Sequence, residues 1–439
     1  MRTFPGGVHP FEGKLYTEKK KIEKLPRPKQ VTIPLQQHIG APTKPLVEKG
    51  QEVKAGEKLS EAEGYVSVPV HASVSGKIKA IEDIDHPVAG RGSAVIIEAN
   101  ETEEWIETIK ADEKYQDLSA DEMRKRIQEG GLAGLGGATF PTHVKLKPPE
   151  DKKIDVALLN GVECEPYLTA DHRLMLEYPQ DIIRGFRIIM KILGVKRGII
   201  GIEKNKKDAA EVIKKQIAGE TGMEVMVLPV KYPQGAEKQL IKAALNREVP
   251  SGGLPMDIGA LVQNVGTAKA IYDAVSSHRP LIERVVTVTG PGIKEPKNLL
   301  IPIGAHFQDI IDFCGGLTEK AAKIIMGGPM MGIAQPNLKV PVIKGTSGIL
   351  VLEERQAHLP VEEPCINCGR CVEVCPSHLL PTTLQRLVYH ERFEDAGKLH
   401  LMDCIECGSC SYICPANRYL VQSIRHGKKQ LLQLRKKAG

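Results

Sequence analysis

Aromatic residues are scarce in this chain of 439 residues: they account for 4% of it and include a single Trp. Proteins that bind nucleic acid generally combine clustered basic residues with aromatic side chains that stack on bases. Here the Lys and Arg residues are dispersed except at the two ends, and the formal net charge is +6. The composition therefore argues against a nucleic-acid partner, and we expect none.

A long uninterrupted apolar stretch is also missing. Five basic residues interrupt the longest apolar segment, residues 181–202: Arg184, Arg187, Lys191, Lys196 and Arg197. A membrane-spanning helix needs about 20 predominantly apolar residues, so we expect no transmembrane segment. The first residues, MRTFPGGVHPFEGK, have no apolar core followed by a small-residue cleavage site, as a secretory signal would. We therefore expect a cytoplasmic chain.

Cysteine is unevenly distributed. Eight of the ten cysteines lie between Cys365 and Cys414, whereas Cys164 and Cys314 stand alone. Because thiols of cytoplasmic proteins stay reduced, such a cluster indicates metal binding rather than disulfides. Cys164, Cys314 and His143 are interpreted as buried residues without a redox or catalytic role.

The clustered cysteines form two copies of the pattern C-x2-C-x2-C-x3-C-P. This pattern is typical of ferredoxin-type domains with two [4Fe–4S] clusters, in which the fourth cysteine of each copy ligates the other cluster. Structural zinc is the alternative, but zinc sites usually combine two separated C-x2-C pairs. The predicted ligands of what we call the first cluster site are Cys365, Cys368, Cys371 and Cys414. Those of the second cluster site are Cys404, Cys407, Cys410 and Cys375.

Changes in residue pattern divide the chain into six parts. We expect an N-terminal extension (1–26), an all-β unit (27–105), an α/β domain (115–282), a β-grasp-like α+β unit (283–352), a helical cysteine domain (360–424) and a basic C-terminal tail (425–439). From residue 118 onward, strands alternate with amphipathic helices. Such alternation predicts a parallel α/β sheet, which binds ligands at the carboxyl ends of its strands. The predicted fold class is therefore multidomain α/β and α+β.

The all-β unit carries a pattern of its own. The segments VEKGQEVKAGEKL and PVHASVSGKI resemble the barrel-sandwich hybrid of biotinyl and lipoyl carrier domains. Carriers display a modified lysine at a point that falls here between Leu59 and Gly76, where this sequence has no Lys. The resemblance therefore implies a structural module rather than a swinging arm.

A Gly-rich loop opens the α/β domain. Its glycines permit close approach of the backbone to a phosphate or a flavin, and a Lys at its end can neutralise a phosphate. By itself the loop is equally compatible with a flexible connection between domains. The stretch GLGGATFPTHVK nevertheless resembles the flavin loop of the NADH-binding 51-kDa subunit of respiratory complex I. LNGVECEP, QGAEKQLI and VQNVGTAKAI follow in the order of further segments of that family.

This resemblance implies a Rossmann-like domain that binds FMN non-covalently and NAD(H) as substrate. The residues it places around FMN are Gly134, Gly136, Gly137, Lys145, Asn160, Glu163, Asn264 and Thr267. Near the nicotinamide it places Phe140, Glu163, Glu165 and Glu237. Three positions depart from the family pattern, namely Thr139 in place of Gly, Val162 in place of Asp and Gly266 in place of Glu. These departures affect the predicted NAD(H)-binding residues more than the predicted FMN-binding residues.

The order of all these units resembles the C subunits of the Rnf complexes, which are ion-translocating ferredoxin:NAD+ oxidoreductases. TFPGGVHP, GGPMMG and CINCGRCVEVCP fit that family too. The resemblance implies an SLBB-like β-grasp unit and an NAD-linked oxidoreductase subunit that is peripheral to the cytoplasmic face of the cell membrane. Its partners would be the membrane subunits and the ferredoxin-type cluster subunit, with ferredoxin reached indirectly. Hydride would pass between NAD(H) and FMN, and single electrons through the two clusters.

Two alternatives to this function and two interpretations of the tail stay open. A cobalamin (corrin) reductase of the propanediol-utilisation type resembles the same domains, and an iron–sulfur scaffold subunit without nucleotide chemistry is the other alternative. The C-terminal tail is either a solvated helix end or a contact with anionic lipid or an acidic partner. Its basic residues are Arg425, Lys428, Lys429, Arg435, Lys436 and Lys437.

Overall fold

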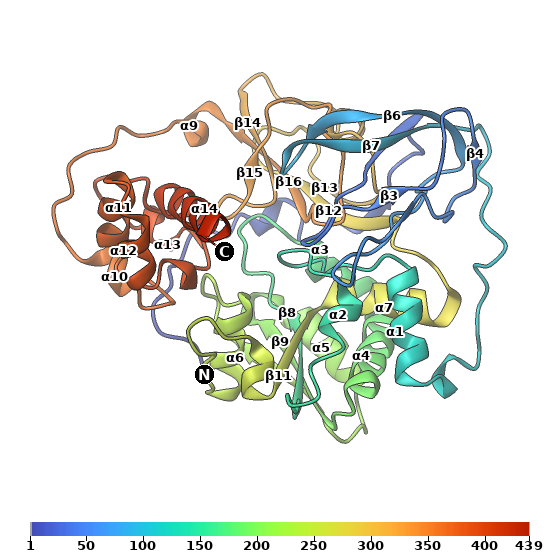
Figure 1. Cartoon of the computed structure of the whole chain (residues 1–439), viewed down its shortest axis with the longest axis horizontal. Coiled ribbons are helices and arrows are strands. Elements are labelled where there is room, and N and C mark those ends of the chain that lie inside the picture. Colours follow the sequence, from blue (N-terminus) through green and yellow to red (C-terminus); the bar gives the residue numbers. More distant parts are fainter. Residues whose placement is uncertain (1, 439) are drawn as a thin grey trace.

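Four units make up the chain, and three of them are built on β-sheets (Figure 1). The structure is a computed structural model and describes residues 2–438. The cysteine-rich helices, coloured orange to red, lie at one side of the molecule, and the green α/β domain lies beneath the two β-rich units. This arrangement confirms the predicted multidomain α/β and α+β fold class.

The all-β unit is a small barrel. Its larger sheet has the order β2 (Gln30–Pro34), β7 (Gly90–Ala99), β6 (Gly76–His86), β4 (Glu52–Val53), and the smaller sheet pairs β3 (Lys44–Pro45) with β5 (Ser60–Glu61). Between Leu59 and Gly76, where carrier domains display their lysine, residues 67–75 are buried and residues 63–65 are exposed. This stretch contains no Lys, which fits the expected structural role.

The α/β domain contains a four-stranded parallel sheet. Its order is β10 (Met223–Leu228), β9 (Arg197–Glu203), β8 (Val156–Gly161), β11 (Ala260–Asn264). One face packs on α1 (Ala120–Glu129), α4 (Pro179–Leu193), α5 (Lys207–Gln216) and α7 (Val265–Ser277), and the other on α6 (Glu237–Leu245). Because β8 lies between β9 and β11, the strand order reverses between β8 and β11. Ligands bind at such a reversal in doubly wound sheets.

The α+β unit has a six-stranded mixed sheet. Its order is β1 (Ile22–Lys24), β13 (Lys297–Pro302), β12 (Glu283–Thr289), β16 (Gly348–Glu353), β14 (Ala321–Met326), β15 (Ile333–Ala334), with α8 (Phe307–Phe313) packed on it. The edge strand β1 comes from the segment expected as an N-terminal extension and pairs in parallel with β13. The first residues of the chain are therefore integrated into the fold, although residue 1 lies outside the described residues.

The cysteine domain is helical. After α9 (Glu354–Ala357) and an extended linker, it comprises α10 (Arg370–Glu373), α11 (Pro381–Tyr389), α12 (Phe393–Lys398), α13 (Ser409–Tyr412) and α14 (Leu420–Ala438). The expected basic tail is part of α14, whose Ile424 and Leu431 are buried in the core of this domain. Residue 439 of that tail lies outside the described residues. None of the described helices is both long enough and apolar enough to span a membrane.

Lys344 joins three of the units. Its side chain is 1% exposed, and its ammonium donates hydrogen bonds to the Pro69 carbonyl in the barrel (3.0 Å) and the Gly131 carbonyl at the start of the Gly-rich loop (2.6 Å). Burial lowers the pKa of Lys344 from 10.5 to about 7, because the charged form loses its hydration. The junction is therefore sensitive to the protonation of one amine.

We predict that this lysine makes the stability of the folded chain rise with pH above about 7. Below that pH the lysine is protonated in both states, whereas above it the unfolded chain binds the extra proton. The variant Lys344→Met removes this dependence. The unfolding free energy of the wild type relative to the variant should therefore increase by about 2.7 kcal/mol between pH 6 and pH 9, because a gain of 1.36 kcal/mol per pH unit covers the two units above pH 7. Denaturant titrations at both pH values measure it.

The exposed Lys339 supplies the matched control. Lys339→Met should leave the pH dependence of the wild type unchanged. Parallel curves for the wild type and Lys344→Met would show that Lys344 does not titrate in this range.

Candidate functional site

Two asparagines lie at the carboxyl ends of the neighbouring strands β8 and β11. Asn160 and Asn264 are directly paired across the sheet, at the carboxyl edge where the strand order reverses. The Asn160 amide donates to the Gly235 carbonyl (2.8 Å), and its side-chain oxygen accepts from the Val162 amide (3.2 Å). Both predicted flavin-binding asparagines thus lie at the edge where ligands of parallel sheets bind.

Asn264 also begins helix α7. Its side-chain oxygen accepts hydrogen bonds from the amides of Gly266 (2.7 Å) and Thr267 (3.3 Å), and its amide donates to the Asp171 carboxylate (2.7 Å). This cap fixes the start of a 13-residue helix, whose N-terminus favours negative charge. Burial, followed by repulsion from Glu163, raises the pKa of Asp171 to about 7.

The Gly-rich loop lies directly on this helix start. The Leu135 amide donates to the Thr267 hydroxyl (2.9 Å), and the Gly134 amide donates to the Phe140 carbonyl (3.0 Å). A Cβ on Gly136 would lie 2.6 Å from the side-chain nitrogen of Asn264, so only glycine permits this approach. Gly136 and Gly137 are exposed, which leaves their backbone open to a ligand.

Thr139 shows why the related family has glycine at that place. Its φ is 52°, in the left-handed region that a β-branched residue rarely adopts. The loop thus keeps the glycine conformation although its sequence departs from the pattern. The Thr139 carbonyl accepts from the Ile39 amide of the barrel (3.3 Å), which ties the loop to its neighbour.

Lys145 closes the site from the other side. It ends α2 (Thr142–Lys145), and its ammonium lies 2.6 Å from the carboxylate of Glu237, the first residue of α6. Both side chains are partly exposed. Backbone amides of the loop, the N-terminus of α7 and this lysine are groups that bind phosphate, and the strand-end amides suit a flavin ring. The residues present therefore fit FMN.

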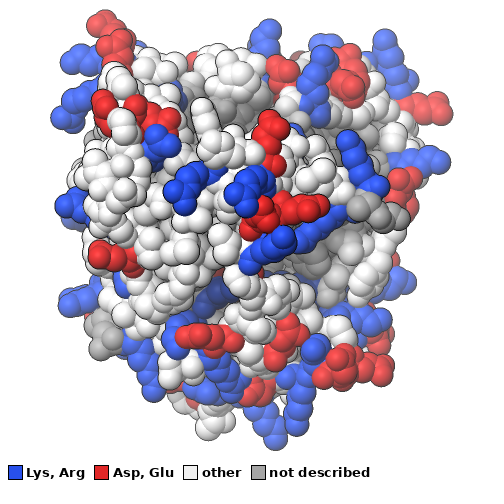
Figure 2. Space-filling view, turned by 60° about the vertical axis from the view of Figure 1, so that its left-hand side comes forward, with Lys and Arg blue, Asp and Glu red and all other residues white. Residues whose placement is uncertain are grey.

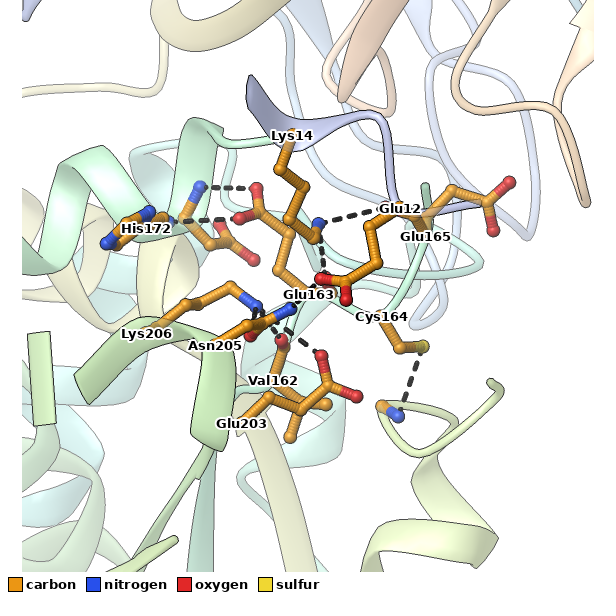
Figure 3. A network of polar contacts seen from close by, with 12 residues as sticks. Glu12, Lys14, Val162, Glu163, Cys164, Glu165, His172, Glu203, Asn205 and Lys206 are labelled. Atoms are coloured by element: carbon orange, nitrogen blue, oxygen red, sulfur yellow. Dashed lines mark hydrogen bonds and ion pairs between the residues drawn. The ribbon is translucent and has the colours of Figure 1, made fainter. Parts of the chain in front are cut away.

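Glu163 and Glu165 are engaged elsewhere (Figure 3). The Glu163 carboxylate accepts from the amides of Asp171 (2.8 Å) and His172 (3.2 Å) at the start of α3 (Ala170–Glu177). The Glu165 carboxylate accepts from the amides of Met330 (2.7 Å) and Met331 (3.1 Å) in the GGPMMG loop. Of the three predicted nucleotide glutamates, the structure brings only Glu237 to Lys145.

Two buried lysines support the segment between β8 and α3 (Figure 3). Lys14, from the N-terminal segment, donates to the carbonyls of Glu163 (2.9 Å), Glu165 (3.1 Å) and Leu168 (2.7 Å). Lys206 donates to the Val162 carbonyl (2.8 Å) and pairs with Glu203. Sequence reasoning missed both lysines, because neither belongs to a motif.

The three residues interpreted as structural are all at least partly buried. Cys164 accepts a hydrogen bond from the Gly235 amide (3.2 Å), and burial raises the pKa of its thiol. Burial likewise raises the pKa of Cys314 to about 12. The buried His143 ring lies against the Tyr65 carbonyl (3.2 Å). Neither thiol is prone to ionise, in keeping with a structural role.

The cysteines line two separate cavities. Cys365, Cys368, Cys371 and Cys414 line a cavity of about 120 Å³, and Cys375, Cys404, Cys407 and Cys410 line a second one. Each cavity thus combines three cysteines of one motif with the fourth of the other. Four thiols around one cavity fit a [4Fe–4S] cluster.

The turns between the ligands have the same backbone conformation in both motifs. The left-handed residues are Asn367 (φ 55°), Gly369 (76°), Glu406 (57°) and Gly408 (77°). In the second motif this turn lets the Glu406 amide donate to the Cys404 sulfur (3.4 Å). Burial, together with the neighbouring thiols, raises the pKa of Cys404 to about 11 and of Cys410 to about 12. Iron binding must therefore displace these protons.

The two cavities differ in their surroundings. Cys365 and Cys368 of the first site are exposed, whereas Cys375, Cys407 and Cys410 of the second site are buried. The second site faces the α/β domain, where the Tyr232 hydroxyl donates to the Cys407 carbonyl (2.8 Å). Tyr232 directly precedes the PQGAEKQLI segment, but nothing in the sequence pattern indicated this contact.

Family models match most of the chain. They are the RnfC barrel sandwich hybrid domain (residues 2–102), the Nuo51 FMN-binding domain (127–273), the SLBB domain (285–334) and the 4Fe-4S dicluster domain (364–418). Among solved structures, a chain of an NAD+-reducing [NiFe]-hydrogenase in its H2-reduced state has a TM-score of 0.50 at 18% identity. The match covers 73% of this chain and 63% of that one, and it shows a shared fold.

Curated relatives match over almost the whole length. The C subunit of the proton-translocating ferredoxin:NAD(+) oxidoreductase complex of Clostridium ljungdahlii is 53% identical, over 98% of this chain and 94% of the relative. The C subunit of the Na(+)-translocating complex of Acetobacterium woodii is 48% identical, over 99% and 98%. The C subunit of the ion-translocating oxidoreductase complex of Rhodobacter capsulatus is 40% identical, over 97% and 82%. The chain therefore belongs to the RnfC family, the C subunits of Rnf complexes, with an FMN-binding domain and a domain for two [4Fe–4S] clusters.

Proposed function

We propose that this chain exchanges electrons with NAD(H) as the C subunit of an ion-translocating ferredoxin:NAD+ oxidoreductase complex. One observation carries the proposal: the Gly-rich loop, Lys145 and the paired asparagines converge at one sheet edge, and residues 231–239 lead from it to the second cluster site. A site for a flavin and a site for a cluster are thus joined by one short segment. This arrangement suits a conversion between two-electron and one-electron transfer.

The proposed flavin site assigns a task to each residue. FMN, when bound, exchanges a hydride with the nicotinamide and single electrons with the clusters. Lys145 and the start of α7 would hold the phosphate of FMN. The loop glycines Gly134, Gly136 and Gly137 would let FMN approach the backbone closely, and Thr267 anchors this loop. Asn160 and Asn264 orient the ring. Phe140 and Glu237 border the nicotinamide, and Glu163 and Glu165 hold the backbone around the site.

The partners follow from the two cluster sites. Because Cys365 and Cys368 are exposed while the second site is enclosed between domains, electrons leave the chain through the first site. The proposed recipient or donor is the ferredoxin-type cluster subunit, and ferredoxin is reached through it. The chain sits peripherally at the cytoplasmic face of the membrane, beside the membrane subunits.

Acidic and basic side chains are interspersed on the face in Figure 2, so this surface carries both signs of charge.

The test uses the full chain, reconstituted anaerobically with iron, sulfide and FMN. NADH is added, and the absorbance of the flavin is followed. The proposal predicts bleaching of the flavin in proportion to the NADH added. A chain that holds about eight irons and FMN but keeps its flavin oxidised would contradict the NAD(H) assignment and favour a scaffold role.

A further inference from the structure

The segment between β10 and α6 touches both sites of the proposed electron path. Its Gly235 carbonyl accepts from Asn160, and Glu237, the first residue of α6, pairs with Lys145 at the flavin site. At its other end the Tyr232 hydroxyl donates to the Cys407 carbonyl (2.8 Å) of the second cluster site. The Gln239 amide, just beyond, donates to the Pro376 carbonyl (3.1 Å). Two donors from the α/β domain therefore reach the backbone beside cluster ligands.

The Tyr232 ring has no freedom to move away. It is 2% exposed, and its backbone exchanges two hydrogen bonds with Val8 (2.8 and 2.9 Å). Gly7 lies so close that a Cβ there would be 2.6 Å from the Tyr232 carbonyl, and its amide donates to the Val374 carbonyl (2.8 Å). The TFPGGVHP segment is thus wedged between Tyr232 and the cysteine domain, and it fixes the direction of the hydroxyl.

A second loop covers the same turn. Met330 packs with Tyr232 and Cys407, and its carbonyl would lie 2.9 Å from a Cβ on Gly408. The loop is held in turn by Glu165, which accepts from the Met330 amide. The turn at Cys407 is therefore enclosed by three segments, and water has little access to its carbonyl. In such a low-dielectric setting one oriented hydroxyl dipole has a large electrostatic effect.

Resting on the ligand set proposed for the second site, we propose that Tyr232 is a positioning residue that raises the reduction potential of the second cluster. Its hydroxyl presents a positive hydrogen to the Cys407 carbonyl (2.8 Å), and the buried Glu165 carboxyl lies beside the same hydroxyl. Reduction adds negative charge to a cluster, and nearby hydrogen-bond donors stabilise that charge. The dipole therefore favours the reduced cluster. Because the same segment holds Asn160 and Lys145, the side chain also fixes the cluster relative to the flavin site.

Lys428 acts on the opposite side of this cluster. Its ammonium donates to the Cys404 carbonyl (2.9 Å), but the charge is paired with Glu406 at 2.6 Å. Arg425 pairs with the same carboxylate (3.0 Å). Two cations and one carboxylate leave one net positive charge here, and replacing either cation would change it. The Tyr232 hydroxyl, in contrast, is a neutral donor whose removal changes no net charge. The tyrosine is therefore the clearer site at which to change the potential.

The test is a potentiometric titration of the reconstituted full chain, followed by the EPR signals of both clusters with mediators and without NADH. Tyr232→Phe keeps the ring and removes the donor. One midpoint potential should become more negative, while the other midpoint and the iron and FMN contents stay unchanged. A Cys368→Ala background, which removes a ligand of the first cluster and with it that cluster, assigns the shifted midpoint to the second cluster. Tyr389→Phe, at an exposed tyrosine of the cysteine domain, should shift neither midpoint.

A second variant has the opposite expected sign. Replacing Tyr232 by 3-fluorotyrosine makes the hydroxyl a stronger donor, and the second midpoint should become more positive. The 3-fluorotyrosine measurement remains informative even if Tyr232→Phe loses its iron, because 3-fluorotyrosine retains both the ring and the hydroxyl. Unchanged midpoints in both variants, or shifts of the same sign, would overturn the proposal. Because NADH is not used, failure of the NAD(H) assignment leaves this test intact.

Discussion

Cys375→Ala is expected to remove the second cluster and to leave the first one in place. Iron should fall from about eight to about four per chain, because each [4Fe–4S] cluster depends on four thiolates. Although Cys375 belongs to the first motif, its side chain lines the cavity of Cys404, Cys407 and Cys410. The EPR signal lost should therefore be the one that Cys407→Ala also removes. Iron analysis and EPR spectra of the reduced protein measure both effects.

Two double variants separate crossed from uncrossed ligation. Cys375→Ala with Cys407→Ala should keep about four irons under crossed ligation, since both changes affect one cluster. Cys375→Ala with Cys371→Ala should lose nearly all iron, because each change then affects a different cluster. Under uncrossed ligation the iron contents are exchanged: the pair Cys375 and Cys407 would lose nearly all iron, and the pair Cys375 and Cys371 would keep about four. That result would refute crossed ligation.

Lys145→Met is expected to weaken FMN binding by about 10- to 100-fold, since hydrogen bonds to charged groups contribute about 1.5–3 kcal/mol. The methionine preserves the length of the side chain and removes the cation that we place at the phosphate. Fluorescence titration of the apoprotein with FMN gives the dissociation constant. Iron content should not change, because the cysteines lie in another domain.

Lys147→Met is the matched control for this variant. Lys147 is two residues further along the chain and exposed, so its loss should leave FMN affinity within about twofold of the wild type. Glu237→Gln extends the comparison. It frees Lys145 from its ion pair, and FMN affinity should be retained or increased. Equal affinities for Lys145→Met and the wild type would place the phosphate elsewhere.

The sequence predicted those elements whose signal is local. The apolar residues of PQDIIRGFRIIMKIL recur at helical spacing, and α4 spans Pro179–Leu193. Alternation of strands and helices from residue 118 predicted the parallel sheet, whose β8 and β11 carry the two expected asparagines near their carboxyl ends. The spacing of the cysteines was by itself enough to predict metal binding. Each of these signals depends on neighbouring residues only.

Features that depend on distant residues escaped prediction. The strand β1 spans only Ile22–Lys24. It pairs with β13 through backbone hydrogen bonds, which do not depend on residue type and so cannot be predicted from the residue pattern. The basic tail was predicted to be a solvated helix end or a contact with anionic lipid or an acidic partner, yet Arg425 and Lys428 pair with Glu406 of the same chain. By contrast, Lys429 and the basic residues after it are exposed. Burial of a charged residue depends on partners far along the chain, which one sequence does not reveal.

The most direct test of the account follows both cofactors after one addition of NADH. Reconstituted wild type and Cys375→Ala are mixed anaerobically with NADH in a stopped-flow instrument, and samples are frozen at intervals for EPR. The account predicts that the flavin bleaches in both proteins, whereas cluster signals, or reduction of an added one-electron acceptor, follow quickly only in the wild type. Equally fast cluster or acceptor reduction in Cys375→Ala would contradict transfer through the second cluster, and a flavin that stays oxidised in both would contradict the NAD(H) site.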